Sequence, residues 1–161
     1  MTQFKQITIK RLRNLSPCYD PTEIGIPENY RANISRFIKD YRNLTQSKDD
    51  MLWVLLRPEF LSDRLCRLFA VWCARKALKL IDDPDKRSIN ACNVAEKFAN
   101  GKATKEELAA ARDAARAAAW DAARTAAWAA ARAAAWDAAR TAQIDKLITI
   151  FETNEVTFND L

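Results

Sequence analysis

Residues 104–142 read TKEELAAARDAARAAAWDAARTAAWAAARAAAWDAARTA, and this stretch decides the fold. Alanine occupies 21 of the 34 positions from 109 to 142. Because alanine is the best helix former, the segment is predicted to be helical even where it is exposed to solvent. Thr104 and Glu107 have the spacing of a capping box at its start. The pattern therefore predicts one long helix over residues 104–151.

A repeat inside this helix carries the candidate binding residues. The segment AARAAAWDAARTA occurs at 114–126 and again, unchanged, at 130–142. Every fourth residue from 112 to 140 is Arg or Trp, and residues four apart are neighbours on a helix, so each Trp lies between guanidinium groups. Rows of Trp and Arg are typical of protein interfaces and of binders of nucleotides or single-stranded nucleic acid. The candidate binding residues, called the Trp/Arg row below, are Arg116, Trp120, Arg124, Trp128, Arg132, Trp136 and Arg140.

Helical geometry leaves the role of the Trp/Arg row open. At about 100° per residue, the three Trp side chains fan around the axis, so no single straight groove can take all of them. Another side of the helix carries a seam of small residues with larger apolar ends, which predicts docking on the rest of the domain. That seam comprises Leu108, Ala115, Ala119, Ala122, Ala126, Ala133, Ile144, Ile148 and Phe151. The row is then part of the core, a surface for a partner or a second copy of the chain, or an exposed repeat without function.

The remaining sequence predicts shorter helices. Residues 1–60 contain short helices and loops, with Thr8 as a helix cap, an amphipathic helix over 29–44, and a buried helix at MLWVLL, which ends before Pro58. Residues 62–101 form a helix pair. Ser62 or Asp63 caps its first helix, Asp83 caps the second, and Asn100-Gly101 ends it. With residues 152–161 as a tail, the chain is predicted to be a single all-α domain, 1–161, of about six helices.

The composition excludes several function classes. The chain has 161 residues, two Gly and no His. So few glycines disfavour an all-β fold and preclude phosphate-binding Gly-rich loops, and without His no Ser-His-Asp or Cys-His triad can be built. The net charge of +5 argues against a mimic of DNA, which would be strongly acidic. We therefore predict a protein that is not an enzyme and has no cofactor.

The cysteines and the apolar runs indicate the compartment. The four Cys show no CxxC pair, which disfavours a metal site and predicts buried, reduced thiols. Asp82, Asp83 and Asp85 are interpreted as capping residues rather than metal ligands. No apolar run has the length of a signal peptide or a membrane span. These features predict a cytoplasmic protein that does not associate with membranes.

Three further stretches carry a resemblance to a known family. They are LRNLSPC at 12–18, LFAVWCAR at 68–75 and DPDKRSINACNVAEKFANG at 83–101. Together with the Ala/Arg/Trp-rich helix, they resemble the immunity-protein-five-like family of tailed-phage and bacterial genomes, over most of residues 8–142. The resemblance implies a small helical accessory protein that acts by binding, without catalytic residues or a cofactor.

These observations lead to two functional expectations. The first is a non-enzymatic binding protein of phage or bacterial conflict, which neutralises a toxin or host-defence protein by protein–protein contact in the cytoplasm (the host cytoplasm if a phage encodes it). The second is a binder, or sponge, of an anionic ligand, such as a nucleotide second messenger or single-stranded nucleic acid, through the Trp/Arg row.

Overall fold

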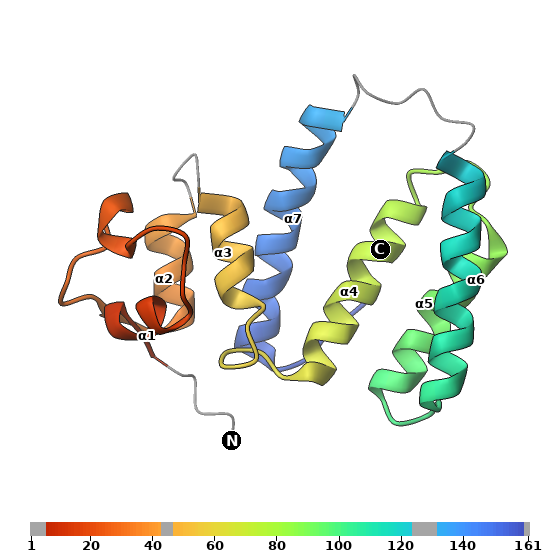
Figure 1. Cartoon of the computed structure of the whole chain (residues 1–161), viewed down its shortest axis with the longest axis horizontal. Coiled ribbons are helices and arrows are strands. Elements are labelled where there is room, and N and C mark those ends of the chain that lie inside the picture. Colours follow the sequence, from red (N-terminus) through yellow and green to blue (C-terminus); the bar gives the residue numbers. More distant parts are fainter. Residues whose placement is uncertain (1–5, 43–46, 124–131, 160–161) are drawn as a thin grey trace. The chain divides into compact units, whose positions relative to one another are not determined.

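The computed structural model describes residues 6–42, 47–123 and 132–159 of the chain (Figure 1). Within these ranges the protein forms seven α-helices, one short 3-10 helix and a two-stranded antiparallel ladder. The predicted all-α class is therefore confirmed. The chain forms two compact units: unit 1 contains Met1–Leu61 and Arg140–Glu155, and unit 2 contains Ser62–Ala139 and Val156–Leu161. Among the described helices, none combines the length and apolar character needed to cross a membrane.

Unit 1 is built from short elements around a small apolar core. Its elements are β1 (Ile7–Thr8), α1 (Ile9–Asn14), the 3-10 helix η1 (Pro21–Ile24), β2 (Arg31–Ala32), α2 (Ile34–Tyr41), α3 (Ser47–Leu55) and the part of α7 (Arg132–Thr153) from Arg140 onward. The largest fully buried side chains come from four of these elements and are Ile7, Ile34, Ile38, Met51, Leu55, Ile144, Leu147 and Ile150. The core of unit 1 therefore joins the first third of the chain to its last helix.

The start of α2 differs from the prediction. The helix expected over 29–44 begins at Ile34 and ends at Tyr41. Residues 31 and 32 instead pair with β1, in the register Ile7↔Ala32 and Thr8↔Arg31. The side chain of Asn33 then accepts a hydrogen bond from the backbone N–H of Arg36, at 2.8 Å, and caps the helix. A periodic apolar pattern does not reveal such a short strand, because two residues are too few to show alternation.

Unit 2 contains the first part of α7, up to Ala139, and three whole helices in sequence, in which α5 packs against both α4 and α6. They are α4 (Asp63–Leu78), α5 (Lys86–Ala99) and α6 (Lys105–Ala123). Ser62 caps α4, as one of the two predicted alternatives. The cap of α5 is Asp85 and not Asp83 as predicted, because the Asp85 carboxylate accepts from the N–H of Arg87 and the helix begins only at Lys86. The predicted end of this helix at Asn100-Gly101 is confirmed, with Gly101 at a φ of +70°.

The long helix predicted over 104–151 corresponds to α6 and α7 in the described residues, and positions 124–131 between them lie outside those residues. The capping box at its start is confirmed: the N–H of Thr104 donates to Glu107 at 2.7 Å, and the N–H of Glu107 donates to Thr104 at 3.1 Å.

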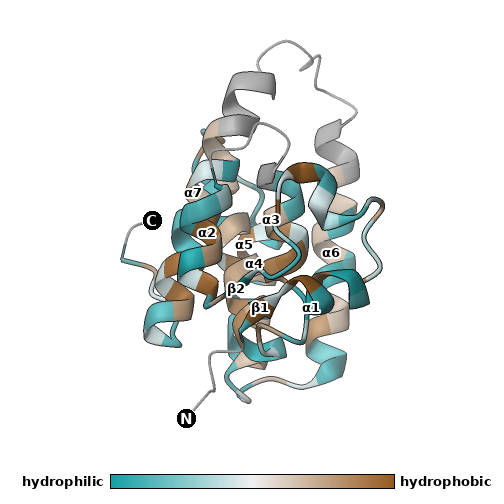
Figure 2. Ribbon diagram, turned by 90° about the vertical axis from the view of Figure 1, so that its left-hand side faces the viewer, coloured by the Kyte–Doolittle hydropathy of each residue, from teal (hydrophilic) through white to brown (hydrophobic). Residues whose placement is uncertain are grey.

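The predicted seam is partly wrong in its register. Among the described side chains of α6, the buried alanines are Ala111 and Ala118, whereas Ala119 is exposed. The side chains of the seam residues Ala122, Ala126 and Ala133 lie outside the described part. In α7 the buried residues include Leu147 and Ile150, which the seam omitted, beside Ile144 and Phe151, which it contained. The two helices bury these faces in different units, so one continuous stripe did not describe both. Figure 2 shows that the described helices carry both hydrophobic and hydrophilic residues.

Candidate functional site

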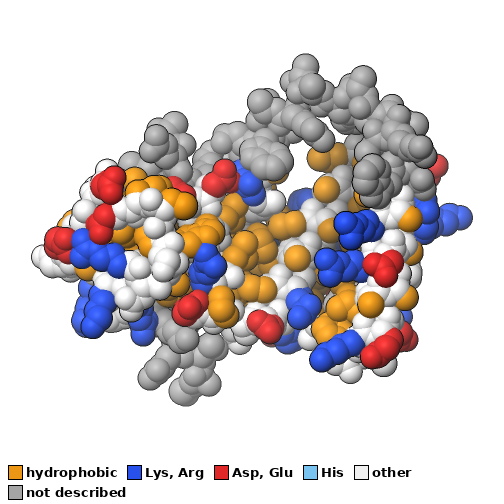
Figure 3. All heavy atoms as spheres, in the orientation of Figure 1, with side chains coloured by type: hydrophobic (Ala, Val, Ile, Leu, Met, Phe, Trp, Pro, Cys, Tyr) orange, Lys and Arg blue, Asp and Glu red, His pale blue; other side chains and the backbone are white. Residues whose placement is uncertain are grey.

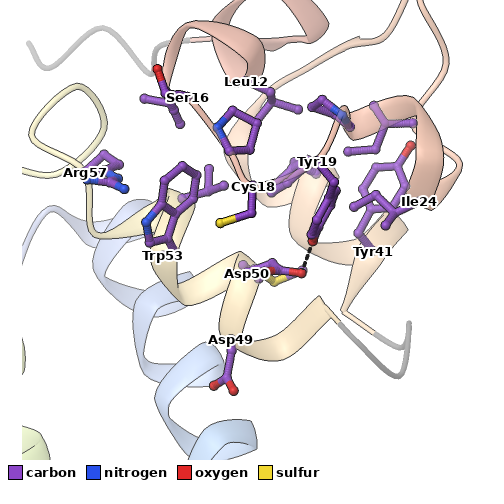
Figure 4. Close-up of a pocket in the computed structure, with 17 residues that line it drawn as sticks. Leu12, Ser16, Cys18, Tyr19, Ile24, Tyr41, Asp49, Asp50, Trp53 and Arg57 are labelled. Atoms are coloured by element: carbon purple, nitrogen blue, oxygen red, sulfur yellow. Dashed lines mark hydrogen bonds between the residues drawn. The ribbon is translucent and has the colours of Figure 1, made fainter.

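Unit 1 contains a pocket of about 510 Å³, formed by α1, the loop after it, η1, α2 and α3 (Figure 4). Its volume lies within the range of pockets that hold small ligands. Most of the wall is apolar or aromatic, contributed by Leu12, Leu15, Pro17, Tyr19, Pro21, Ile24, Ile26, Phe37, Tyr41, Met51, Trp53 and Val54. The other lining residues are Ser16, Cys18, Asp49, Asp50 and Arg57. The pocket is therefore an apolar cavity with few polar groups.

Local backbone geometry shapes one wall of the pocket. After α1, Ser16 adopts a left-handed conformation with a φ of 56°, which turns the chain toward Pro17, Cys18 and Tyr19. Asp20 then caps η1, and its carboxylate accepts from the N–H of Thr22 at 2.9 Å. The turn and the cap together hold the segment 16–19 against α3, as Figure 4 shows for Cys18 and Tyr19.

Tyr19 and Asp50 form the polar contact on the pocket wall. The Tyr19 hydroxyl donates a hydrogen bond to the Asp50 carboxylate (Figure 4). Partial burial first, and then this hydrogen bond, raises the pKa of Tyr19 to about 12. The phenol is therefore protonated at neutral pH, and its donor is already used by Asp50.

Arg57 supplies the positive charge of the pocket. Its guanidinium lies over the Trp53 ring, 3.9 Å from the ring centroid, and the two side chains lie next to each other in Figure 4. The Nε atom of Arg57 is buried and has no hydrogen-bond acceptor among the described residues. A buried donor without an acceptor costs about 1–3 kcal/mol, so an acceptor brought by a ligand would be favourable here.

Asp49 points away from the pocket in Figure 4 and is paired with Arg140 of α7, with 2.6 Å between Oδ1 and Nε. Arg140 also donates to the side chain of Gln143 at 3.2 Å. The sequence predicted Arg140 as a binding residue. In the structure its guanidinium contacts side chains of unit 1, where the pair with Asp49 connects α3 to α7.

The two members of the Trp/Arg row whose side chains are described belong to different units. Arg116 is exposed on α6 in unit 2, whereas Arg140 belongs to unit 1. Trp120, Arg132 and Trp136 lie in α6 or α7, but their side chains lie outside the described part. Arg124 and Trp128 lie outside the described residues altogether. Figure 3 shows Lys and Arg side chains among hydrophobic ones on the part of the surface where Figure 1 places α5 and α6.

Sequence reasoning missed the pocket, although one signal for it was present. Trp53 and Arg57 are four residues apart, the same spacing that singled out the Trp/Arg row. The aromatic and polar residues of the loop, Cys18 and Tyr19, carried no such signal, because only the tertiary structure brings them to α3.

The thiols and carboxylates of the described residues do not suggest a metal site. No group of three or more Cys, Asp and Glu there is arranged to hold a metal ion. None of the four cysteines is in a disulfide, but only Cys92 is buried, so the prediction of buried thiols is wrong for Cys18, which is exposed. Burial raises the pKa of the Cys66 and Cys92 thiols.

No family model, curated protein or solved structure matches this chain.

Proposed function

We propose that this chain is a non-enzymatic binding protein of phage or bacterial conflict, which neutralises a toxin or host-defence protein by direct contact. In this proposal the pocket of unit 1 receives an apolar side chain of that partner. The protein acts in the cytoplasm, which is the host cytoplasm if a phage encodes it. The resemblance of residues 12–18, 68–75 and 83–101 to immunity proteins supports the role in conflict.

The observation that carries the proposal is the composition of the pocket wall. Tyr19, Tyr41, Trp53 and Arg57 line one cavity. Trp, Tyr and Arg are the residues that dominate the binding energy of protein interfaces, especially around a pocket that takes an anchor side chain. Side chains of unit 1 alone form the cavity, so binding would not require its formation.

Site-directed photo-cross-linking in bacterial cells tests this proposal. A benzophenone amino acid replaces Glu59, which is exposed two residues after Arg57, or Lys102, which is exposed in unit 2. We expect position 59 to cross-link a distinct protein, identified by mass spectrometry, that position 102 does not capture. Trp53→Ala should abolish this cross-link while the helical circular dichroism is retained.

The proposal is wrong if a folded Trp53→Ala variant cross-links the same protein to the same extent. Equal capture from positions 59 and 102 would also contradict it, because the contact would then not be specific to the pocket.

The exposure of Arg112 and Arg116 on α6 favours a second candidate function. Two guanidinium groups one helical turn apart offer positive charge to an anionic ligand, such as a nucleotide or single-stranded nucleic acid. Calorimetry with a panel of nucleotides tests this alternative. Binding that is lost in an Arg112→Ala, Arg116→Ala variant supports it, and absence of heat across the panel rejects it.

A further inference from the structure

We infer that the pocket of unit 1 is a site for a carboxylate joined to an apolar body, with the carboxylate at Arg57 and the apolar body against the aromatic wall. The inference rests on the proposed use of this pocket for binding, and it adds the chemical class of the group that enters.

The apolar body follows from the walls of the pocket. Leu12, Ile24, Phe37, Met51 and Val54 all line the cavity of about 510 Å³. Their side chains offer no hydrogen bonds, so a strongly polar ligand would lose its contacts with water without replacement. An aliphatic chain or an aromatic ring fits these walls.

The carboxylate follows from the state of the charged lining residues. Asp49 is paired with Arg140, and Asp50 accepts a hydrogen bond from the hydroxyl of Tyr19. Arg57 differs from both, because its buried Nε lacks an acceptor among the described residues. A carboxylate accepts from a guanidinium through short, charge-assisted hydrogen bonds, which a neutral amide cannot match.

The positions of these groups agree with one orientation of the ligand. In Figure 4 Arg57 lies on the far side of Trp53 from Asp50 and Tyr19. The negative charge of Asp50 is therefore separated from the proposed carboxylate position by the indole ring. The apolar body would extend from Arg57 past the edge of the Trp53 ring along the apolar walls of the cavity.

Isothermal titration calorimetry of the full chain tests the inference with matched probes. The probes are 4-phenylbutyrate, its neutral amide, and 4-phenylbutylamine. We expect the acid to bind about tenfold or more tightly than the amide, because only the acid forms charge-assisted hydrogen bonds with Arg57. Equal affinity of acid and amide, or tighter binding of the amine, would overturn the inference.

Two variants assign the preference to Arg57. Arg57→Gln should remove the preference for the acid over the amide. Arg31→Gln, at an exposed arginine of unit 1 that does not line the pocket, should retain it. A folded Arg57→Gln variant that keeps the full preference would contradict the assignment.

A measurement on the unmodified chain covers the case in which Arg57→Gln does not fold. Cys18 is exposed and lines the pocket, and its sulfur points into it in Figure 4. We expect 4-phenylbutyrate to slow the alkylation of Cys18 by N-ethylmaleimide, measured by peptide mass spectrometry, without slowing that of Cys73. Unchanged alkylation of Cys18 at saturating acid would reject the site.

A last comparison separates the two sources of the carboxylate. A short peptide with a carboxy-terminal phenylalanine is titrated beside its amidated form. Preference for the free peptide carboxylate over 4-phenylbutyrate identifies a protein carboxyl terminus, and the reverse identifies a free acid. If none of the acids binds but the cross-link at position 59 persists, the inference fails while the proposed function stands.

Discussion

Each of the three tyrosines of this chain is partly buried, which keeps it protonated. Partial burial is the first cause for each of them, and it raises the pKa of Tyr19, Tyr30 and Tyr41 above the ordinary 10.0. Hydrogen bonds add to this effect, from Tyr19 to Asp50 and from Tyr30 to Asp40. A phenolate next to a carboxylate would be repelled, so these contacts favour the neutral phenol.

Titration of the tyrosines is the prediction at this scale. We expect ultraviolet absorbance to show the folded chain forming its phenolates above pH 10.0, with Tyr19 near pH 12. The pKa values of the tyrosines are higher in the folded chain than in the unfolded chain. The stability that the neutral phenols contribute is therefore fully present below pH 10.0, and it is lost as the pH rises through the folded pKa values.

The unfolded chain in denaturant is the control, and its phenolates should be half formed at about pH 10. Tyr19→Phe should remove one of the three phenolate signals. A folded chain that titrates like the unfolded one would contradict the prediction.

At the scale of the elements, local hydrogen bonds set the helix ends, and the residues that form them can be recognised in the sequence. Thr8, Ser62 and Thr104 were each recognisable as caps and are observed as caps. Asp85 takes the place predicted for Asp83 because both are good caps at nearby positions, and the sequence pattern does not choose between them.

Thr104→Ala tests the contribution of a cap to unit 2. The substitution removes the acceptor for the N–H of Glu107, and we expect the free energy of unfolding to fall by about 0.5–2 kcal/mol. Denaturant unfolding followed by circular dichroism measures it. Lys105→Ala, at an exposed neighbouring position, should change the stability by less than about 0.5 kcal/mol. Equal effects of the two substitutions would show that the cap does not stabilise α6.

At the scale of the whole molecule, the chain returns to its first unit near its end. Residues 140–155 join residues 1–61 in unit 1, whereas the segment between them belongs to unit 2. Ile144, Leu147 and Ile150 of α7 are almost completely buried there. Unit 1 therefore depends on a helix that is distant in sequence.

Leu147→Ala tests this dependence. Leu147 has no exposed surface, and its truncation should lower the stability of unit 1 by about 2–5 kcal/mol. We expect hydrogen exchange to lose protection first in α2 and α3, ahead of α4 and α5. Glu152→Ala, exposed on the same helix, is the matched control and should leave protection unchanged. Loss of protection that begins in α4 and α5 would contradict the assignment of α7 to unit 1.

The sequence alone determined the all-α class, most helix caps and the strong helical tendency of the alanine-rich segment. These features depend on propensity and on hydrogen bonds between residues three or four positions apart, which can be read along the chain. It did not determine which faces of α6 and α7 are buried, because the two helices bury these faces in different units and one continuous stripe does not describe both.

Only the tertiary structure decided where the pocket lies. The pocket joins Tyr19, Phe37 and Trp53, which come from separate elements and whose proximity no periodicity encodes. It also decided that Arg140 is paired with Asp49, a contact between residues far apart in sequence. Local interactions form between residues that are close in the sequence. A cavity instead depends on how whole elements pack, and that packing results from burial of the core as a whole.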